Sequence, residues 1–184
     1  GGIANISHIP PQSKQTEVIG FDTGPGMSLI DETCIQCFNK PFDENGSLSI
    51  KGNINNDLLN GLMMHPFINK EYPKSTGRHE FGSEIVHKII KEWKNLSHYD
   101  ILRTFVSFTA NSIWKNILLI RNFTRQNWEL IVSGGGVFHP VLMSDLEYYT
   151  SQKIKTSNDY GINPKFKEGL LMSVLGAAKL MELP

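Results

Sequence analysis

The stretch that decides the fold is Gly20-Phe21-Asp22-Thr23-Gly24-Pro25-Gly26, GFDTGPG in one-letter code. It follows a segment, 16–21, that predicts a short strand, and it precedes a segment, 28–38, with apolar residues at helical spacing. A glycine-rich turn between a strand and a helix lets main-chain N–H groups approach an anion, and the helix dipole favours negative charge there. The residues alone leave two interpretations open, a phosphate-binding loop and a plain turn whose Asp22 caps the next helix.

The side chains of this run add a candidate for chemistry. Asp22 stands where the predicted strand ends, the usual place for a catalytic or metal-linked carboxylate, and Thr23 adds a hydroxyl donor. A second glycine-rich loop, Ser133–Gly136 (SGGG), follows a predicted strand at 128–132 and precedes a predicted helix at 140–149. Three consecutive glycines leave room for a flat ring or a phosphate against the main chain, although a tight strand-to-helix connection is the alternative. Two such loops favour a nucleotide, because a nucleotide has two ends to hold.

A third polar cluster lies in Pro73–Arg78 (PKSTGR), which predicts an exposed, glycine-containing turn. Lys74, Ser75, Thr76 and Arg78 suit recognition of a carboxylate or phosphate, since an arginine binds either group through two parallel hydrogen bonds. The GxxxxGK spacing of a Walker loop is missing. A solvated surface turn is the alternative interpretation.

The rest of the chain predicts one α/β domain. Apolar periodicity predicts helices at 53–64, 80–93 and 100–120, and the last is apolar around so much of its circumference that we expect a central buried helix. Further predicted elements are a first strand in 1–9, a turn or small hairpin at 42–46 (FDENG), a weak strand at 153–156, and a last helix from Pro164 to Leu183.

Composition limits the classes of function. The chain has 184 residues, of which 40% are apolar and 20% charged, which is typical of a globular protein. Eighteen basic residues balance eighteen acidic ones, so the overall charge indicates neither nucleic acid nor a membrane surface as partner. No apolar stretch approaches the roughly 20 residues of a membrane span, and no signal peptide opens the chain. We therefore expect a cytoplasmic protein.

Metal and hydrolase chemistry have little support in the sequence. Cys34 and Cys37 form CIQC, which we interpret as two ordinary thiols on a helix rather than a redox pair or half of a zinc site. The histidines lack metal-ligand spacing on a predicted helix, and no serine lies in a GxSxG motif.

Taken together, the motifs resemble the anhydro-N-acetylmuramic acid kinase family, part of the superfamily of acetate and sugar kinases, seventy-kilodalton heat-shock proteins and actin. The resemblance runs in order along nearly the whole chain, through GGIANI, GFDTGPG followed by LID, FDENG, PKSTGR, TFVSFTANSI, SGGG and DYGINPKFKEG.

This resemblance implies an α/β fold, an RNase H-like lobe of the actin-like ATPase type with a mixed sheet flanked by helices. Residues 1–184 would be the C-terminal lobe of a two-lobed kinase that binds ATP with Mg²⁺, together with an amino sugar, between its lobes. In the family's reaction water opens the 1,6-anhydro ring of the sugar at C1, and the released O6 accepts the γ-phosphoryl group. The family also implies a homodimer.

The resemblance also implies roles for particular residues. Asp22 would be the general base that activates the water. The nucleotide-binding residues would be Gly20, Asp22, Thr23, Gly24, Pro25, Gly26, Gly134, Gly135 and Gly136. Polar groups near the sugar or the lobe interface would be Lys74, Arg78 and Glu168.

Three departures from the family pattern keep other functions open. The family's N-terminal GTSxDG phosphate loop is absent, and Met27 and His139 stand where the family has asparagine. The small change of KEA to Lys167-Glu168-Gly169 is a further difference. We expect a kinase in the full-length protein, with this chain alone inefficient. The alternatives are an inactive nucleotide- or sugar-binding homologue with a regulatory role, and a relative that phosphorylates another sugar or small acid.

Overall fold

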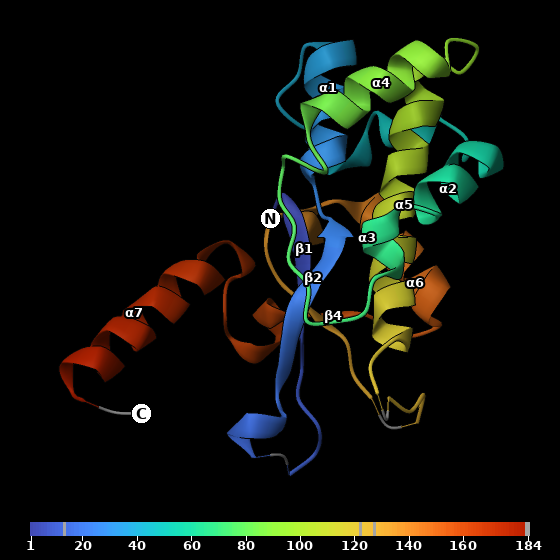
Figure 1. Cartoon of the computed structure of the whole chain (residues 1–184). Helices are drawn as coiled ribbons and strands as arrows, with labels where there is room; N and C mark the ends of the chain where they lie inside the picture. The colour runs from blue at the N-terminus through green and yellow to red at the C-terminus, as the bar shows by residue number, and fades with distance from the viewer. Residues whose placement is uncertain (13, 122, 127, 183–184) are drawn as a thin grey trace.

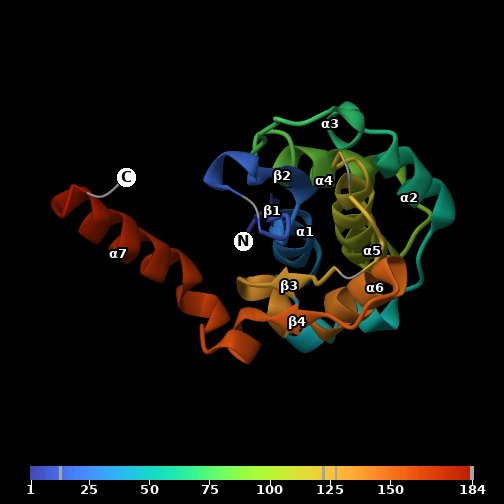
Figure 2. The ribbon, with the colours of Figure 1, turned by 90° about the horizontal axis from the view of Figure 1, so that it is seen from below.

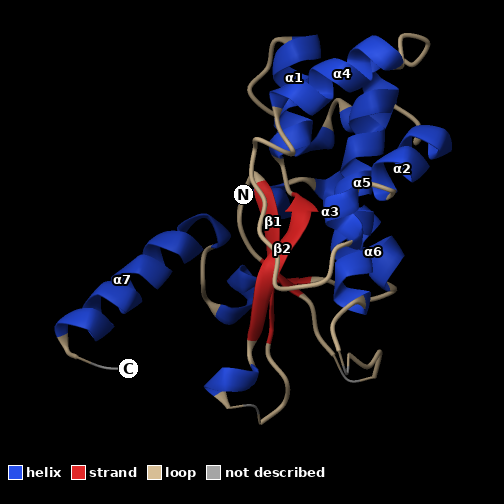
Figure 3. Cartoon of the chain, viewed as in Figure 1, coloured by secondary structure: helices blue, strands red, loops and turns tan. Residues whose placement is uncertain are grey.

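The structure, a computed structural model, describes residues 1–12, 14–121, 123–126 and 128–182. The chain forms an α/β arrangement in which two small sheets are flanked by helices (Figure 3). The elements are β1 (Ile3–His8), β2 (Ile19–Pro25), α1 (Ser28–Phe38), α2 (Asn56–Met63), α3 (Pro66–Asn69), α4 (Ser83–Glu92), α5 (His98–Leu118), β3 (Ile131–Val132), α6 (Pro140–Thr150), β4 (Lys155–Thr156) and α7 (Lys167–Leu180).

The GFDTGPG run is strand for most of its length, so the prediction of a glycine-rich turn there was wrong. Strand β2 begins at Ile19 rather than 16, pairs antiparallel with β1 and continues to Pro25. Gly24 has a φ of 137° and packs so closely that an added Cβ would lie 2.8 Å from Ile68 Cδ1. The glycine is therefore needed for backbone conformation and packing, and the turn into α1 is made by Gly26 and Met27 alone.

The predicted single mixed sheet is two separate two-stranded sheets. In the second of these, β3 pairs parallel with β4 through Ile131↔Lys155 and Val132↔Thr156. Figure 2 shows the β3–β4 pair lying apart from β1 and β2. The strands expected at 128–132 and 153–156 are thus shortened to two residues each, while the mixed α/β character is confirmed.

Helix α5 is the centre of the structure, as its apolar pattern predicted. Phe105 and Phe108 on this helix are fully buried against Leu29 of α1 and Phe81, which precedes α4. Burying each such side chain contributes about 1.5–3 kcal/mol, so this contact set is a main source of stability. Helices α1, α2 and α6 also contact α5 (Figure 1).

Several helix ends follow the sequence signals. Helix α1 has the predicted bounds. Helix α5 begins at His98, and the side chain of the preceding Ser97 caps it by accepting from Asp100 N–H. The FDENG segment is a 3₁₀ turn, Glu44–Gly46, rather than a hairpin. The predicted last helix divides into a 3₁₀ turn, Pro164–Phe166, and α7, and the predicted end at Leu183 lies outside the described residues.

Helix α7 projects away from the rest of the chain (Figure 1). None of its residues is buried, and an apolar stripe formed by Leu170, Leu171, Val174 and Leu175 is about half exposed, with values of 47–56%. An isolated helix of about 14 residues is marginally stable in water, and most helices gain stability by burying an apolar face. We therefore expect the apolar stripe of α7 to pack against a partner. No helix in the described part of the chain combines the length and apolarity that a membrane span needs.

Candidate active site

Asp22 lies half-buried in β2 and faces the PKSTGR turn. Its Oδ2 accepts a hydrogen bond from Ser75 Oγ at 2.8 Å and another from the main-chain N–H of Thr76 at 2.9 Å. The main-chain N–H of Asp22 donates to Lys74 O at 3.1 Å. The structure thus joins two motifs, GFDTGPG and PKSTGR, that are about fifty residues apart in the sequence.

Lys74 is buried, which corrects the prediction that the whole PKSTGR turn is exposed. Its Nζ donates to the main-chain oxygens of Phe67, at 2.8 Å, and Ile68, at 3.4 Å, and lies 4.7 Å from the centre of the Phe67 ring. Burial, with smaller contributions from Lys115 and Lys70, lowers the pKa of Lys74 to about 8. The ammonium group therefore anchors the turn to α3, and its bonds point to main-chain oxygens rather than toward an open site.

Arg78, at the other end of the turn, is exposed and lies beside the start of α1. Its Nη1 is 3.6 Å from Glu32 Oε1, and its guanidinium borders Gly2. In the first turn of α1, burial raises the pKa of Asp31 to about 6, and the charge of Arg78 opposes this shift only in part. A long cation with one loose carboxylate contact is free to reach a ligand anion.

Helix α5 holds β2 through polar side chains that the sequence reasoning missed. Thr109 Oγ1 donates to Gly26 O at 3.0 Å, and Asn116 Nδ2 donates to Thr23 O at 3.0 Å. The Thr23 side chain is itself fully buried, with its hydroxyl donating to Ala4 O at 3.2 Å. The hydroxyl expected to serve a ligand is therefore engaged inside the β1–β2 pair.

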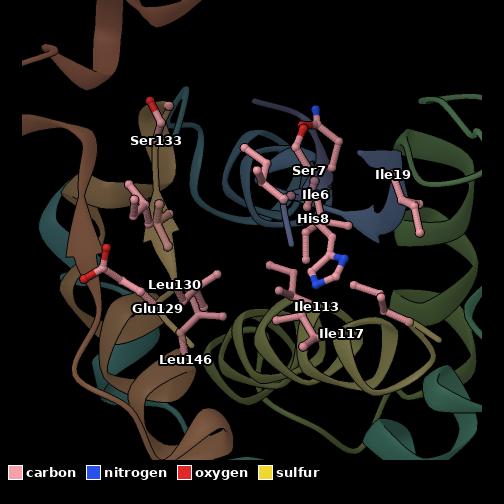
Figure 4. Close-up of a pocket in the computed structure, with 18 of the residues that line it drawn as sticks. Ile6, Ser7, His8, Ile19, Ile113, Ile117, Glu129, Leu130, Ser133 and Leu146 are labelled. Carbon is pink, nitrogen blue, oxygen red and sulfur yellow. The ribbon is translucent and has the colours of Figure 1, made fainter. Parts of the chain in front are cut away.

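A large open cleft of about 1590 Å³ separates the two sheets (Figure 4). Isoleucines of β1 and α5, including Ile6, Ile113 and Ile117, form its apolar walls. Gly26, the glycines of the SGGG loop and Glu168 line it, whereas Asp22, Lys74 and Arg78 do not. The structure thus divides the predicted site residues into a cleft group and a second group around Asp22.

The SGGG loop borders this cleft with little side-chain cover. Gly134 has a φ of 95°, and an added Cβ on Gly135 would meet no atom within 4 Å. An added Cβ on Gly136 would lie 3.6 Å from Met27 Sδ, so Met27 lies beside the loop at the start of α1. Because no side chain covers the main chain at Gly135, a flat ring or a phosphate could lie close to the backbone there.

His139, which follows this loop, is a buried structural residue. Its Nδ1 accepts from the main-chain N–H of Leu142 at 3.1 Å and caps α6, while Nε2 lies 3.1 Å from Asp43 Oδ2. Because Nδ1 accepts, the ring carries its hydrogen on Nε2 and donates it to Asp43. His139 therefore supplies the helix cap that an asparagine could also provide at this position.

The two cysteines of α1 are free thiols. Cys34 is buried, and burial together with the nearby Asp43 raises its pKa to about 12, so the thiolate is strongly disfavoured. Within residues 1–12, 14–121, 123–126 and 128–182, no three His, Cys, Asp or Glu side chains come together as a metal site would require.

Comparison with known proteins shows which family the chain resembles. The profile of a family described as "Anhydro-N-acetylmuramic acid kinase" matches residues 1–184. Curated proteins of that name are similar to the chain. One from Bacillus cereus (strain AH187) is 35% identical over 181 aligned positions, and the alignment covers 95% of this chain and 47% of the relative. One from Clostridioides difficile (strain 630) is 36% identical over 180 aligned positions, and the alignment covers 96% of this chain and 46% of the relative.

A third such protein, from Shewanella oneidensis, is 37% identical over 185 aligned positions, and the alignment covers 100% of this chain and 48% of the relative. The chain therefore spans about half the length of these curated relatives. With a family match along its whole length, the chain belongs to the anhydro-N-acetylmuramic acid kinase family.

Proposed function

We propose that this chain is the C-terminal lobe of a kinase that phosphorylates 1,6-anhydro-N-acetylmuramic acid with ATP and opens its anhydro ring with water, giving the 6-phosphate. Family membership supports the reaction class. The observation that carries the proposal is the geometry of Asp22, a half-buried carboxylate whose Oδ2 is held by two donors. Such a carboxylate has the fixed position that a general base requires.

In the proposed reaction Asp22 takes a proton from water as the water oxygen bonds to C1 of the sugar. The C1–O6 bond breaks, and O6 keeps that electron pair. O6 then bonds to the γ-phosphorus, and the bond from that phosphorus to the β-γ bridging oxygen breaks to leave ADP. The protein's contribution is to position the water and the nucleotide, since phosphoryl transfer depends mainly on alignment and electrostatic stabilisation.

The cleft group is proposed to hold the nucleotide. Gly26 and the SGGG loop border the same cleft, and the bare main chain at Gly135 leaves space for the adenosine end. Mg²⁺ is proposed to arrive with ATP as part of the substrate, because Mg²⁺ is usually held by phosphates, waters and one or two carboxylates. Glu168 and Arg78 are proposed to face the sugar or the other lobe.

A second lobe is part of the proposal. The relatives are about twice as long as this chain, and the apolar stripe of α7 is left without a packing partner among the described residues. We propose that further polypeptide of the full-length protein covers this stripe and completes an RNase H-like pair of lobes around the nucleotide. A homodimer of that protein, located in the cytoplasm where ATP is available, completes the proposal.

The test is ADP formation by the protein that spans the relatives' full length. We expect turnover with 1,6-anhydro-N-acetylmuramic acid and none with N-acetylmuramic acid, which lacks the anhydro bridge and serves as the control sugar. If another sugar or small acid in a substrate panel turns over instead, the assigned substrate is wrong. Nucleotide binding by calorimetry without turnover on any sugar would instead indicate an inactive homologue.

A further inference from the structure

The two carboxylate oxygens of Asp22 lie in different environments. Both hydrogen bonds from the PKSTGR turn end on Oδ2, one from the Ser75 hydroxyl and one from the Thr76 main chain. Among the described residues, none donates to Oδ1. A carboxylate oxygen has two lone pairs in its plane, and those of Oδ2 are taken by the two donors, so Oδ1 is the oxygen left open to a water molecule.

This asymmetry also fixes the direction of the carboxylate. The terminal torsion of an aspartate side chain is broad and roughly two-fold, so an unrestrained carboxylate rotates over a wide range. Two donors from adjacent residues of one turn restrict that rotation. A base that is held within a narrow range of directions keeps its water aligned with the bond that forms, and misplacement by about 1 Å can cost about a hundredfold in rate.

The turn that carries the two donors is itself tied to the core at both ends. The buried Lys74 ammonium anchors its start on α3, and the main-chain oxygen of Lys74 accepts from Asp22 N–H. At its other end, the Thr76 side chain donates through Oγ1 to Glu80 Oε2 at 2.5 Å, and Phe81, which is fully buried, donates its N–H to Gly77 O. The main chain that carries Ser75 is thus held by hydrogen bonds on either side of this residue.

We propose that Ser75 is a positioning residue for the general base, acting with the Thr76 main-chain N–H to hold Asp22 Oδ2 so that Oδ1 receives the proton from water. This inference rests on the proposed function, because it assigns a role within that reaction. A positioning role for Ser75 changes the interpretation of the PKSTGR turn. Instead of binding a substrate anion through its hydroxyls, the turn orients the carboxylate that acts on the water.

The test compares Ser75→Ala and Ser75→Thr in the protein that spans the relatives' full length, with sugar-dependent ADP formation as the readout. Loss of one hydrogen bond to a charged group predicts a fall in kcat of about tenfold for Ser75→Ala, with an unchanged KM for the sugar. Ser75→Thr keeps the hydroxyl and restores most of kcat. Ser47→Ala, which alters an exposed serine with no side-chain bond among the described residues, is the matched control and leaves kcat unchanged.

A second comparison separates positioning from a purely structural role. In the Asp22→Asn background, Ser75→Ala should lower the residual rate no further, because the group that it positions is gone. A raised sugar KM with normal kcat would instead make Ser75 a substrate ligand and overturn the proposal. Equal losses in both backgrounds, or no loss in an active protein, would also overturn it. An unchanged protein without sugar-dependent turnover refutes the proposed function and this inference together.

Discussion

Replacement of His139 tests how the SGGG loop is joined to the helix that follows it. His139 is only 2% exposed, accepts from Leu142 N–H through Nδ1 and donates to Asp43 through Nε2. His139→Ala removes both interactions at once. It leaves one helix N–H uncapped and one buried carboxylate short of a donor, and we expect α6 and the loop before it to loosen.

The size of the effect follows from these contacts. Burial alone would raise the pKa of Asp43, but hydrogen bonds from His139 and from the N–H groups of Leu48 and Ser49 outweigh it and lower the pKa from 3.8 to about 2. This lowering corresponds to about 2 kcal/mol of stability, present above about pH 4 and lost as the pH falls toward about 2. Losing the His139 bond and the helix cap together predicts about 3 kcal/mol for His139→Ala.

His139→Asn provides the informative contrast. Asparagine can cap α6, but its shorter side chain does not span the distance to Asp43, so we expect a loss of about 2 kcal/mol. In urea unfolding at neutral pH, a slope of about 2 kcal/mol per molar predicts that the midpoint for His139→Ala falls by about 1.5 M. His87→Ala, on the exposed face of α4, is the control. A His139→Ala midpoint within about 0.3 M of the unchanged protein would refute the reasoning.

Three further predictions concern other parts of the chain. Burial raises the pKa of Asp31 from 3.8 to about 6, so the free energy of unfolding falls as the pH rises between these two values. In urea unfolding at about pH 7.5, Asp31→Asn should therefore be more stable than the unchanged protein by up to about 1 kcal/mol. This gain should vanish near pH 4. Gly24→Ala, at φ 137°, should cost about 2 kcal/mol in the same assay, whereas Gly61→Ala, at an exposed position of α2, should be neutral or stabilising. Leu171→Glu should leave the melting temperature of this chain unchanged but lower that of a protein that spans the relatives' full length, and equal melting shifts in both would contradict a covered α7.

The sequence predicted the helices better than the strand that carries the site. Helices α1, α5 and α6 followed from apolar periodicity, and their bounds came within two residues of those expected. The GFDTGPG run was predicted as a turn because Gly and Pro are the usual local turn signals. In the structure Gly24 is required by its contact with Ile68, a residue more than forty positions away, and no local pattern reports such a contact.

Individual polar residues were the hardest to predict. Lys74 was expected at the surface, where lysines normally lie, and only the fold brings the main-chain oxygens of Phe67 and Ile68 to its ammonium group. Thr109 and Asn116 look like interruptions in an apolar helix until β2 is packed against them. The motifs could be recognised from the sequence, but the pairing of Asp22 with Ser75 depends on tertiary structure.

The most direct test of the proposed chemistry is the turnover of Asp22→Asn in the protein that spans the relatives' full length. Asparagine keeps the shape of the side chain but cannot take a proton from water, so kcat for 1,6-anhydro-N-acetylmuramic acid should fall by at least about a hundredfold. Calorimetry should show that the variant still binds ATP. A variant that retains the kcat of the unchanged protein would contradict the assignment of Asp22 as the general base.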